Sequence, residues 1–356
     1  MKVVPILHEL SRRDIPGVFV HTGQHYDVQM SDALLRDLDA PVPDVHLEVG
    51  SGSHAQQTAR VMERFEPVLL ERRPAWIVVV GDVNSTLACA LVASKLRSEL
   101  DCRIAHVESG LRSDDWHMPE EVNRVLTDRL SDLLLTPIPD ALANIEREGL
   151  DPERAVFVGN VMIDALHTTL SRARALEMAK RFGLKIDGYV VATLHRPSNV
   201  DDSERLEMLL EALGALSRDV PVVFPMHPRT RARIAGSPLE KLLGEVVVTE
   251  PLGYAEMLGL LDSSTLALTD SGGVQQETTV LGVPCVTVRD RTEWPLTIGY
   301  GTNQLATWPP TAASLVHDAK GALARSREPV GARAPDGWDG HAARRIVDAL
   351  CTASVS

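Results

Sequence analysis

The sequence predicts an α/β protein built from two doubly wound domains. Short runs rich in β-branched residues alternate with longer amphipathic stretches along the chain, as strands and helices do in such folds. Runs such as Trp76 to Val80 are apolar throughout, which is typical of parallel strands that are buried on both faces. A length of 356 residues is more than one hydrophobic core usually serves, so it favours two domains.

The first periodic segment is a helix and not a strand. Apolar residues between Val3 and Leu10 fall on one helical face, and the first strand-like run, 18–20, comes after them. Because a strand normally precedes the first helix of an alternating α/β domain, we expect that the first strand of the N-terminal domain is missing before Met1. A fold that begins with a helix explains this periodicity equally well.

Further strands are expected wherever a β-branched run separates two amphipathic segments. They are the ranges 45–49, 76–80, 103–107, 132–136, 155–158, 189–193, 220–224, 246–249, 266–269 and 285–288. A long helix is expected at 161–181, so the first domain should span residues 1–159 and the second residues 160–339. The remaining residues, 340–356, contain a helix that is expected to pack back on the first domain. Since ligands of parallel sheets bind at the carboxyl ends of strands, we expect the active site in the interdomain cleft.

Composition and charge exclude several classes of function. The 36 basic and 49 acidic residues give a net charge of −13, which opposes non-specific binding to nucleic acid or to an anionic membrane surface. No stretch approaches the roughly 18 to 20 apolar residues of a membrane span. The four cysteines form no C-x-x-C pair, so no metal site is expected. No secretion signal is recognisable, and we expect a cytoplasmic protein.

A glycine-rich motif at residues 50–55, GSGSHA, fits the dinucleotide pattern G-x-G-x-x-G/A. The strand expected before it carries alternating polar residues and follows Pro41 and Pro43, whereas the fingerprint strand is normally buried. Glu71, the acidic residue about 20 positions further on, lies at a helix end. We therefore interpret the motif as a Gly/Ser loop and expect no cofactor.

Three carboxylates stand where a parallel sheet places functional groups. Asp82 and Glu108 follow two successive strands, and Glu120 lies in the first turn of the next helix, so the three can converge on one cleft. Each also has a structural interpretation: Asp82 as a helix cap, Glu108 as a partner of Arg112, and Glu120 as a carboxylate favoured by the helix dipole. Clustered carboxylates are a common source of acid and base groups of unlike pKa.

The second half of the chain carries groups suited to an anion. Ser271, Gly272 and Gly273 stand at a strand-to-helix junction, where backbone N–H groups attract phosphate. Glu277, about one turn later, suits two ribose hydroxyls, although a plain capped helix also tolerates this sequence. Further cations follow two other strands, in His195-Arg196 and His227-Pro-Arg229. These groups suit a diphosphate.

Nine motifs in order resemble those of the non-hydrolysing UDP-N-acetylglucosamine 2-epimerases. They are HTGQHYD, GDVNST, HVESGLRS, PEEVNR, GNVMIDAL, TLHRPSNVDD, DSGGVQQE, GVPCVTVRDRTEWP and GTNQL. The resemblance runs from Met1 to about Leu305. It implies two Rossmann-like domains in a glycosyltransferase-B arrangement, usually a homodimer, that interconverts UDP-N-acetylglucosamine and UDP-N-acetylmannosamine.

The same resemblance implies roles for individual residues. Asp82, Glu108 and Glu120 are the acid and base candidates for elimination of UDP to a 2-acetamidoglucal and its re-addition. The groups implied on the UDP side are His195, which we also count as catalytic, with Lys2, Arg124, Ser271, Gly272, Gly273 and Glu277. Some family members bind a second substrate molecule as an activator, and Gln24, Arg60 and His227 lie where that site would be.

The chain departs from the family pattern at several positions. The family's first strand and its Gly-Thr-Arg-Pro loop are absent before the first helix. Ser198 replaces a common glutamate, and Trp294 and Leu296 replace the arginine and second glutamate of a T-E-R-P-E motif. Two other functions therefore stay open: a glycosyltransferase of the same architecture, and a non-catalytic nucleotide-sugar binder inactivated by N-terminal loss.

Overall fold

The computed structural model describes residues 1–23, 35–325, 327–332 and 334–353. The chain divides into two compact units. Unit 1 consists of Met1–Ala165 together with Asp336–Ser356, and unit 2 of Leu166–Pro335. The corresponding boundaries predicted from the sequence are residues 159 and 339. The chain thus leaves unit 1 once and returns to it with its last helix.

Unit 1 alternates strands and helices along most of its length. Its helices are α1 (Val4–Arg12), α3 (His54–Arg72), α4 (Asn84–Lys95), α5 (Pro119–Leu130), α6 (Asp140–Arg147), the 3₁₀ helix η1 (Pro152–Arg154) and α16 (Ala342–Ala353). Its strands are β1 (Val20–His21), β2 (Val45–His46), β3 (Trp76–Val80), β4 (Arg103–Val107), β5 (Leu133–Thr136) and β6 (Ala155–Phe157).

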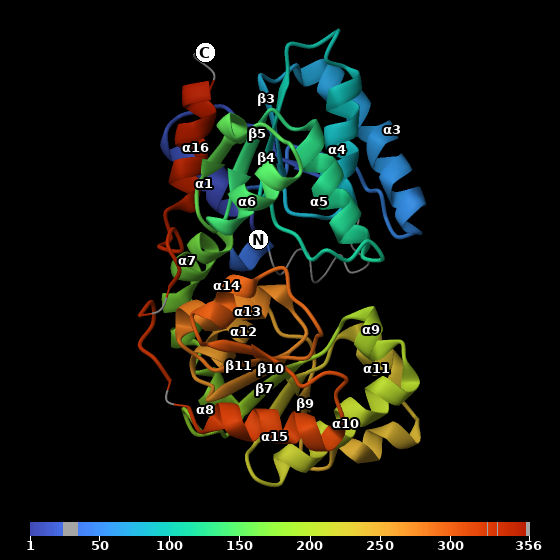
Figure 1. Ribbon diagram of the computed structural model, residues 1–356, viewed down its shortest axis with the longest axis vertical. Coiled ribbons are helices and arrows are strands. Elements are labelled where there is room, and N and C mark those ends of the chain that lie inside the picture. The colour runs from blue at the N-terminus through green and yellow to red at the C-terminus, as the bar shows by residue number, and fades with distance from the viewer. Residues whose placement is uncertain (24–34, 326, 333, 354–356) are drawn as a thin grey trace. The chain divides into compact units, whose positions relative to one another are not determined.

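The strands of unit 1 form two parallel sheets, with orders β1-β2 and β3-β4-β5-β6. Alternate residues of β3 enter two cores: Ile77 and Val79 pack with α3 and α4, whereas Val78 and Val80 pack with α1 and α16. Figure 1 shows α3 and α4 on one side of these strands and α1 and α16 on the other. The larger sheet is therefore covered on both faces, as its apolar strands predict.

The C-terminal helix α16 is anchored to unit 1 by a buried carboxylate. Asp164 accepts hydrogen bonds from the backbone N–H groups of Ala342 (3.0 Å) and Ala343 (2.7 Å), which stand at the start of α16. Ile346 and Val347 of α16 are buried in the same core as Ile6 of α1. Helix α16 thus completes one face of unit 1.

Helix α7 (Val161–Ala175) begins in unit 1 and continues into unit 2. The other helices of unit 2 are α8 (Met178–Arg181), α9 (Pro197–Val200), α10 (Ser203–Ser217), α11 (Pro228–Ile234), η2 (Pro238–Leu243), α12 (Tyr254–Asp262), α13 (Gly272–Leu281), α14 (Pro295–Gly299) and α15 (Ala312–Leu323). Its strands are β7 (Val190–Thr193), β8 (Val222–Pro225), β9 (Val247–Thr249), β10 (Leu266–Thr269), β11 (Cys285–Thr287) and β12 (Asn303–Leu305).

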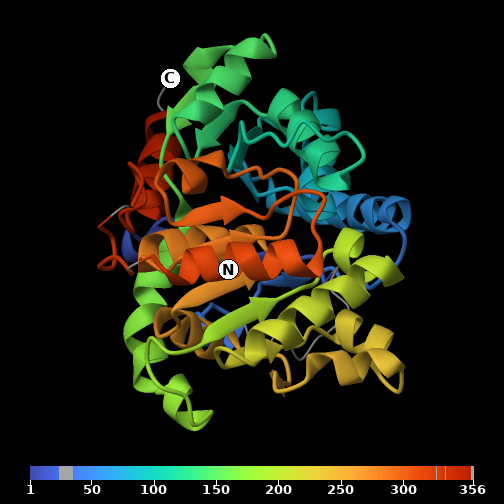
Figure 2. The same cartoon turned by 60° about the horizontal axis from the view of Figure 1, so that its bottom comes forward.

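The strands of unit 2 form one parallel sheet in the order β12-β11-β10-β7-β8-β9. One face packs against α10 and α15, which lie side by side and are seen in yellow-green and orange-red in Figure 2. The alternate residues Val191 and Ala267 point to the other face and are also buried. Unit 2 is therefore a doubly wound sheet in which β7 and β10 are central.

Three details differ from the sequence-based expectations. The helix expected at 161–181 is interrupted, because Glu177 adopts a left-handed conformation (φ 46°) between α7 and α8. Strand β12 was not predicted, since its sequence Asn-Gln-Leu carries little strand signal. The strand expected at 45–49 contains only Val45–His46 and belongs to the two-stranded sheet, so the 50–55 motif does not follow a central strand.

A search of the described helices finds none with the length and apolar character that crossing a bilayer requires.

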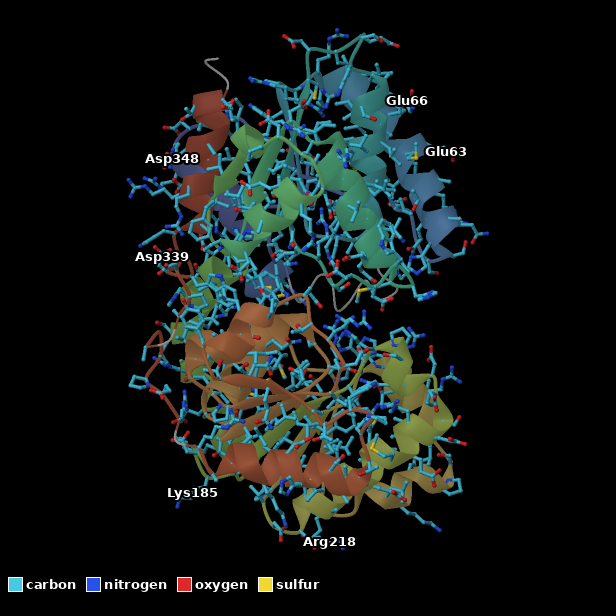
Figure 3. All side chains as sticks on the ribbon, in the orientation of Figure 1. Glu63, Glu66, Lys185, Arg218, Asp339 and Asp348 are labelled. Carbon is cyan, nitrogen blue, oxygen red and sulfur yellow. The ribbon has the colours of Figure 1, made fainter. Side chains whose placement is uncertain are left out.

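We predict that Asp164→Ala destabilises the protein by about 1 to 3 kcal/mol, because the N–H groups of Ala342 and Ala343 lose a buried acceptor. Asp348→Ala is the matched control on α16: its carboxylate, labelled in Figure 3, is about half exposed (54 %) and pairs with Arg13. An exposed pair contributes about 1 kcal/mol or less. Thermal unfolding followed by circular dichroism measures both variants. Equal losses for the two would contradict the anchoring role of Asp164.

Candidate active site

Two of the three predicted carboxylates are brought together by the pairing of β3 with β4. These strands run parallel, with Val80 opposite Val107, and the amide of Gly81 donates to the Val107 carbonyl (3.0 Å). Glu108 directly follows β4, and Asp82 follows β3 after one residue, Gly81. The two residues therefore leave the larger sheet of unit 1 at the same edge, the edge at which parallel sheets bind their ligands.

Glu108 is held in an unusual environment. Its side chain is 4 % exposed, and its Oε2 lies 2.5 Å from the Nζ of Lys2, the residue preceding α1 by two positions. Its Oε1 is buried and has no hydrogen-bond partner among the described residues. Its φ is 69°, in a region that non-glycine residues seldom adopt. The structural alternative, a pair with Arg112, is wrong, because Arg112 instead pairs with Asp128 and Glu148.

The start of α5 presents two adjacent glutamates with different surroundings. Glu121 is buried and accepts hydrogen bonds from the amides of Ser113 (3.0 Å) and Asp114 (2.8 Å), so it fixes the loop before the helix. Glu120, the predicted residue, is half-buried in the first turn, where the helix dipole favours a carboxylate. Of the two, Glu120 is the one whose side chain stays partly exposed.

Asp82 is positioned by α5 and not by the helix that follows it. The Nε of Arg124 lies 3.1 Å from the Asp82 Oδ2, and the side-chain amide of Asn123 donates to the Asp82 carbonyl (2.8 Å). The expectation that Asp82 caps the next helix is wrong, since α4 begins at Asn84 after Val83 without a side-chain cap. Arg124 itself is buried and also pairs with Glu121.

In unit 2, Asp270 organises the segment that follows β7. Its carboxylate accepts from the Nδ1 of His195 (2.9 Å), the amide of Arg196 (2.9 Å) and the side chain of Asn199 (3.2 Å). Burial acts to raise the pKa of Asp270, but these donors outweigh it and lower the pKa below its ordinary value. His195 therefore carries its proton on Nδ1, and Nε2 is the ring atom that Asp270 does not hold.

A hollow of about 190 Å³ lies at the carboxyl ends of β7, β8 and β10. Three predicted residues line it: His195, His227 and Ser271. The two histidine rings lie 6.0 Å apart, and burial, with His195 and Arg229 as neighbouring charges, lowers the pKa of His227. Apolar side chains, including Leu252 and Met257, supply much of the remaining wall.

The predicted anion site at the start of α13 has a close internal neighbour. Ser271 is the N-cap, with its hydroxyl accepting from the Val274 amide (3.5 Å). A Cβ atom on Gly272 would lie 2.7 Å from the Oε1 of Glu293, so only glycine fits there without a shift. Glu293 also pairs with Arg196 (3.3 Å) and Arg289 (2.8 Å). The helix terminus is thus accompanied by two cations and one carboxylate.

Glu277 is buried within α13 beside Tyr254 of α12. Burial raises the pKa of Glu277 to about 7, an effect that the Tyr254 hydroxyl only partly opposes. Both the Glu277 Oε1 and the Tyr254 hydroxyl are buried without a hydrogen bond of normal geometry among the described residues. A buried carboxylate without a full set of donors is suited to receiving hydroxyl groups from a ligand.

The three residues of the candidate regulatory site are not brought together within one unit. Arg60 lies on α3 of unit 1 and donates to the carbonyls of Val49 (3.3 Å) and Ser51 (3.0 Å). His227 lies in unit 2, where it caps α11. Gln24 lies outside the described residues.

Two family departures also have defined places. Ser198 lies in the short helix α9, and Trp294 is buried with its indole Nε1 3.5 Å from a Cβ built on Gly272. Trp294 therefore packs against the same helix terminus as Glu293.

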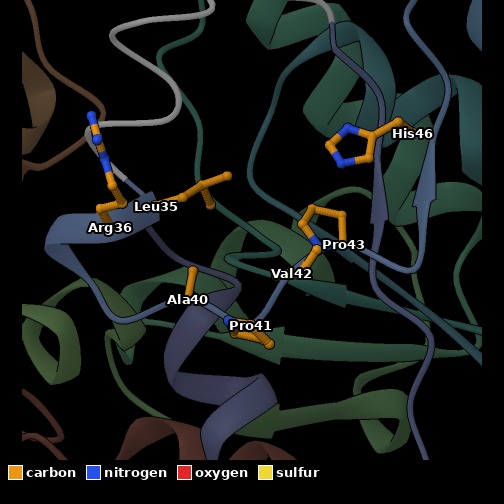
Figure 4. Close-up of a pocket in the computed structure, with 7 residues that line it drawn as sticks. All are labelled: Leu35, Arg36, Ala40, Pro41, Val42, Pro43 and His46. Atoms are coloured by element: carbon orange, nitrogen blue, oxygen red, sulfur yellow. The ribbon is translucent and has the colours of Figure 1, made fainter.

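Outside these clusters, unit 1 has a larger hollow of about 680 Å³ near β2, shown in Figure 4. Arg36 and His46 line it on opposite sides of the view, and Ala40 to Pro43 form much of its wall. No predicted site residue lines it. Among the described residues, no group of three or more His, Cys, Asp or Glu side chains is arranged to hold a metal ion.

Sequence reasoning missed the buried groups that support the candidate residues. They include His106, Glu121, Asp128, Tyr254 and Glu293. The one signal available for His106 was a histidine within the otherwise strand-like run Arg103–Val107. The partners of the other groups are distant in the sequence or belong to loops, so no periodic pattern marks them.

Comparison with known proteins gives consistent matches over most of the chain. The sequence profile of the UDP-N-acetylglucosamine 2-epimerase family matches residues 8–351. A UDP-2,3-diacetamido-2,3-dideoxy-D-glucuronate 2-epimerase from Pseudomonas aeruginosa is 44 % identical over 300 residues, covering 83 % of this chain and 81 % of that protein. A UDP-N-acetylglucosamine 2-epimerase from Methanocaldococcus jannaschii is 42 % identical over 313 residues, covering 86 % and 84 %.

Solved structures give the same picture. The crystal structure of Methanocaldococcus jannaschii UDP-GlcNAc 2-epimerase in complex with UDP-GlcNAc and UDP matches with a TM-score of 0.88 and 38 % identity. The match covers 99 % of this chain and 96 % of that one. Together with the parallel sheets of the two units, it confirms the predicted α/β fold class.

We predict that Glu277→Gln changes how stability depends on pH. The folded protein holds the Glu277 proton up to a pKa of about 7, whereas the unfolded chain releases it near 4.5. In the native protein this group therefore lowers the free energy of unfolding as pH rises between these values, by at most about 3 kcal/mol. Urea unfolding at pH 5 and pH 8 should show Glu277→Gln gaining stability relative to the native protein at pH 8.

The matched control is Glu207→Gln, at an exposed site on α10, which should follow the native protein at both pH values. Parallel pH curves for the native protein and Glu277→Gln would contradict the raised pKa.

Proposed function

The chain belongs to the UDP-N-acetylglucosamine 2-epimerase family, and from this premise we propose that it interconverts UDP-N-acetylglucosamine and UDP-N-acetylmannosamine. The observation that carries the proposal is the convergence of Asp82 and Glu108 at adjacent strand ends, with Glu120 opening the next helix of the same unit. Inversion at carbon 2 requires groups that remove and return a proton, and carboxylates supply them.

The proposed reaction runs through a 2-acetamidoglucal. The carbon 2 proton has no adjacent carbonyl to acidify it, so its removal is coupled to loss of UDP. A base takes the proton, the bond from carbon 1 to the diphosphate oxygen breaks, and UDP leaves with that electron pair while a carbon 1–carbon 2 double bond forms. UDP then adds back at carbon 1, and an acid delivers a proton to the opposite face of carbon 2.

Within this scheme we assign the proton transfers to Asp82, Glu108 and Glu120. Their surroundings differ in a way that suits unlike roles: Asp82 contacts the Arg124 guanidinium, Glu108 contacts Lys2 and is almost fully buried, and Glu120 is half-buried at a helix start. The reaction needs one group to remove a proton and another to return one, and three carboxylates with different contacts can divide these tasks.

We assign retention of UDP chiefly to unit 2. Ser271, Gly272 and Gly273 at the start of α13 would receive the phosphates, His195 would face the diphosphate through Nε2, and Glu277 would accept the ribose hydroxyls. Lys2 and Arg124 complete the proposed set from unit 1. Cations and helix N–H groups stabilise the charge that develops on the departing diphosphate. In this assignment the acid and base groups belong to the N-terminal domain, and most of the UDP-binding groups belong to the C-terminal domain.

By resemblance to the family we further propose a homodimer that works in the cytoplasm and supplies a sugar nucleotide for polysaccharide synthesis. A glycosyltransferase or a non-catalytic binder is not favoured, because both leave the carboxylate cluster of unit 1 without a task.

We predict that incubation with UDP-N-acetylglucosamine in heavy water places deuterium at carbon 2 of both epimers, because the proton is exchanged with solvent during each passage. Asp82→Asn, Glu108→Gln and Glu120→Gln should each slow this exchange by at least about 100-fold. Nuclear magnetic resonance or mass spectrometry of the recovered sugar nucleotides measures the label.

Glu63→Gln is the matched control for these variants. Glu63 is exposed on α3, where Figure 3 labels it, and its substitution should leave the exchange rate unchanged. If the native protein transfers sugar to an acceptor without deuterium uptake, or binds the nucleotide sugar without turnover, the proposed function is wrong.

We predict that the unmodified sugar is the better substrate, because the motif HVESGLRS at residues 106–113 resembles the group of epimerases that act on unmodified sugars. The value of kcat/KM for UDP-N-acetylglucosamine should exceed that for UDP-2,3-diacetamido-2,3-dideoxy-D-glucuronate by at least about tenfold. The same deuterium assay with both compounds measures the ratio. A reversed preference would overturn the choice of sugar while leaving the reaction type intact.

A further inference from the structure

Strand β4 carries a histidine that is completely buried. His106 is 0 % exposed, and its partner Asp128 on α5 is equally inaccessible. A buried imidazole and a buried carboxylate are costly to fold unless every polar atom finds a partner. Neither residue belongs to the set assigned above to proton transfer or UDP binding, so their contacts need a separate explanation.

The contacts of His106 fix where its protons lie. Its Nε2 is 2.9 Å from the carbonyl oxygen of Gly81, and because a carbonyl only accepts, Nε2 must donate. Its Nδ1 is 2.6 Å from the Oδ1 of Asp128, so a second proton lies between these two atoms. The imidazole thus uses both nitrogens at once, one toward the turn after β3 and one toward α5.

Asp128 is in turn held by two further donors. Its Oδ2 accepts from the amide of Gly110 (3.0 Å) and lies 2.8 Å from a guanidinium nitrogen of Arg112. Burial acts to raise the pKa of Asp128, but His106, Arg112 and the Gly110 amide outweigh it and lower the pKa. The charged carboxylate is therefore the form these donors favour.

The segments joined by this pair are the three that carry the proposed acid and base residues. Gly81 directly precedes Asp82. Gly110 lies two residues after Glu108, and His106 lies two residues before it. Asp128 stands on the same helix, α5, that begins with Glu120. The His106 imidazole and the Asp128 carboxylate thus connect the turn after β3, the end of β4 and helix α5.

We propose that His106 and Asp128 are positioning residues for the epimerisation, setting the distances among Asp82, Glu108 and Glu120 without touching the substrate. The inference rests on the proposed function. Proton transfer depends steeply on geometry, and a displacement of about 1 Å far from the reacting atoms can cost about 100-fold in rate. The hydrogen bonds of His106 and Asp128 join all three segments and so limit such displacements, whereas a contact within one segment does not.

Two substitutions of His106 separate its contact to Gly81 from its contact to Asp128. His106→Asn places an amide N–H where Nδ1 stood, so it keeps the Asp128 contact and loses the one to Gly81. His106→Gln places an amide nitrogen where Nε2 stood and can keep the Gly81 contact. We expect His106→Asn to lower kcat by about 10- to 100-fold with KM for UDP-N-acetylglucosamine changed less than about threefold, because UDP is held chiefly by unit 2. His106→Gln should recover part of the lost kcat.

The matched control is Tyr189→Phe in unit 2. Tyr189 is 0 % exposed, and its hydroxyl contacts the Leu260 carbonyl (2.6 Å) and Ser263 (2.7 Å), so its loss also removes buried hydrogen bonds. It lies just before β7, at the amino end of that strand, whereas the proposed site residues follow the carboxyl ends. Tyr189→Phe should lower the melting temperature and leave kcat unchanged when it is assayed well below melting.

Each result bears on the inference. A fall in kcat for His106→Asn at full folded population, measured by circular dichroism at the assay temperature, supports it. If His106→Asn fails to fold, Asp128→Asn is assayed in the same way and should show the same kcat-selective loss. Unchanged kcat in a folded variant, or equal effects on kcat and KM, overturns the positioning role. Absence of deuterium exchange in the native protein instead overturns the proposed function.

Discussion

Parallel pairing of β3 with β4 is the constraint on which the rest of the acidic site depends. The register sets Val80 opposite Val107, and the chain leaves both strands at the same edge of the sheet. The Gly81 amide extends the pairing by one further hydrogen bond to the Val107 carbonyl. Because strands of opposite direction would place these ends at opposite edges, only a parallel pair brings Asp82 and Glu108 together.

The charged groups near the candidate residues form ion pairs that are buried or partly buried, although the protein as a whole has a net charge of −13. A cation removed from water is stabilised by an adjacent anion, and three cations near the candidate residues have one: Lys2 has Glu108, Arg124 has Asp82 and Glu121, and Arg289 has Glu293. The overall charge therefore says little about the local field. In unit 1, the carboxylate partners of Lys2 and Arg124 are themselves the proposed acid and base residues or their neighbours.

Sequence patterns predicted what repeats along the chain and missed what depends on contacts between distant segments. The buried strands were recognisable because β-branched runs such as Trp76–Val80 are apolar throughout, and Asp82 and Glu108 were recognisable because they follow such runs. Strand β12 was not predicted because Asn303 is polar. In the structure Asn303 is buried, and its side-chain oxygen accepts a hydrogen bond from Thr287 (2.7 Å). The His106–Asp128 pair spans 22 residues and two element types, so no local period marks it.

The two adjacent glutamates of α5 show why residue type alone could not complete the assignment. Consecutive helical residues point about 100° apart, so Glu120 and Glu121 necessarily face different surroundings. Glu121 faces inward, where the Ser113 and Asp114 amides and Arg124 occupy its oxygens. The Glu121 carboxylate is therefore committed to contacts within the protein, which hold the loop before α5 in place. The half-buried Glu120 has no such contacts among the described residues, and for this reason we propose Glu120, and not Glu121, as the third acid or base candidate.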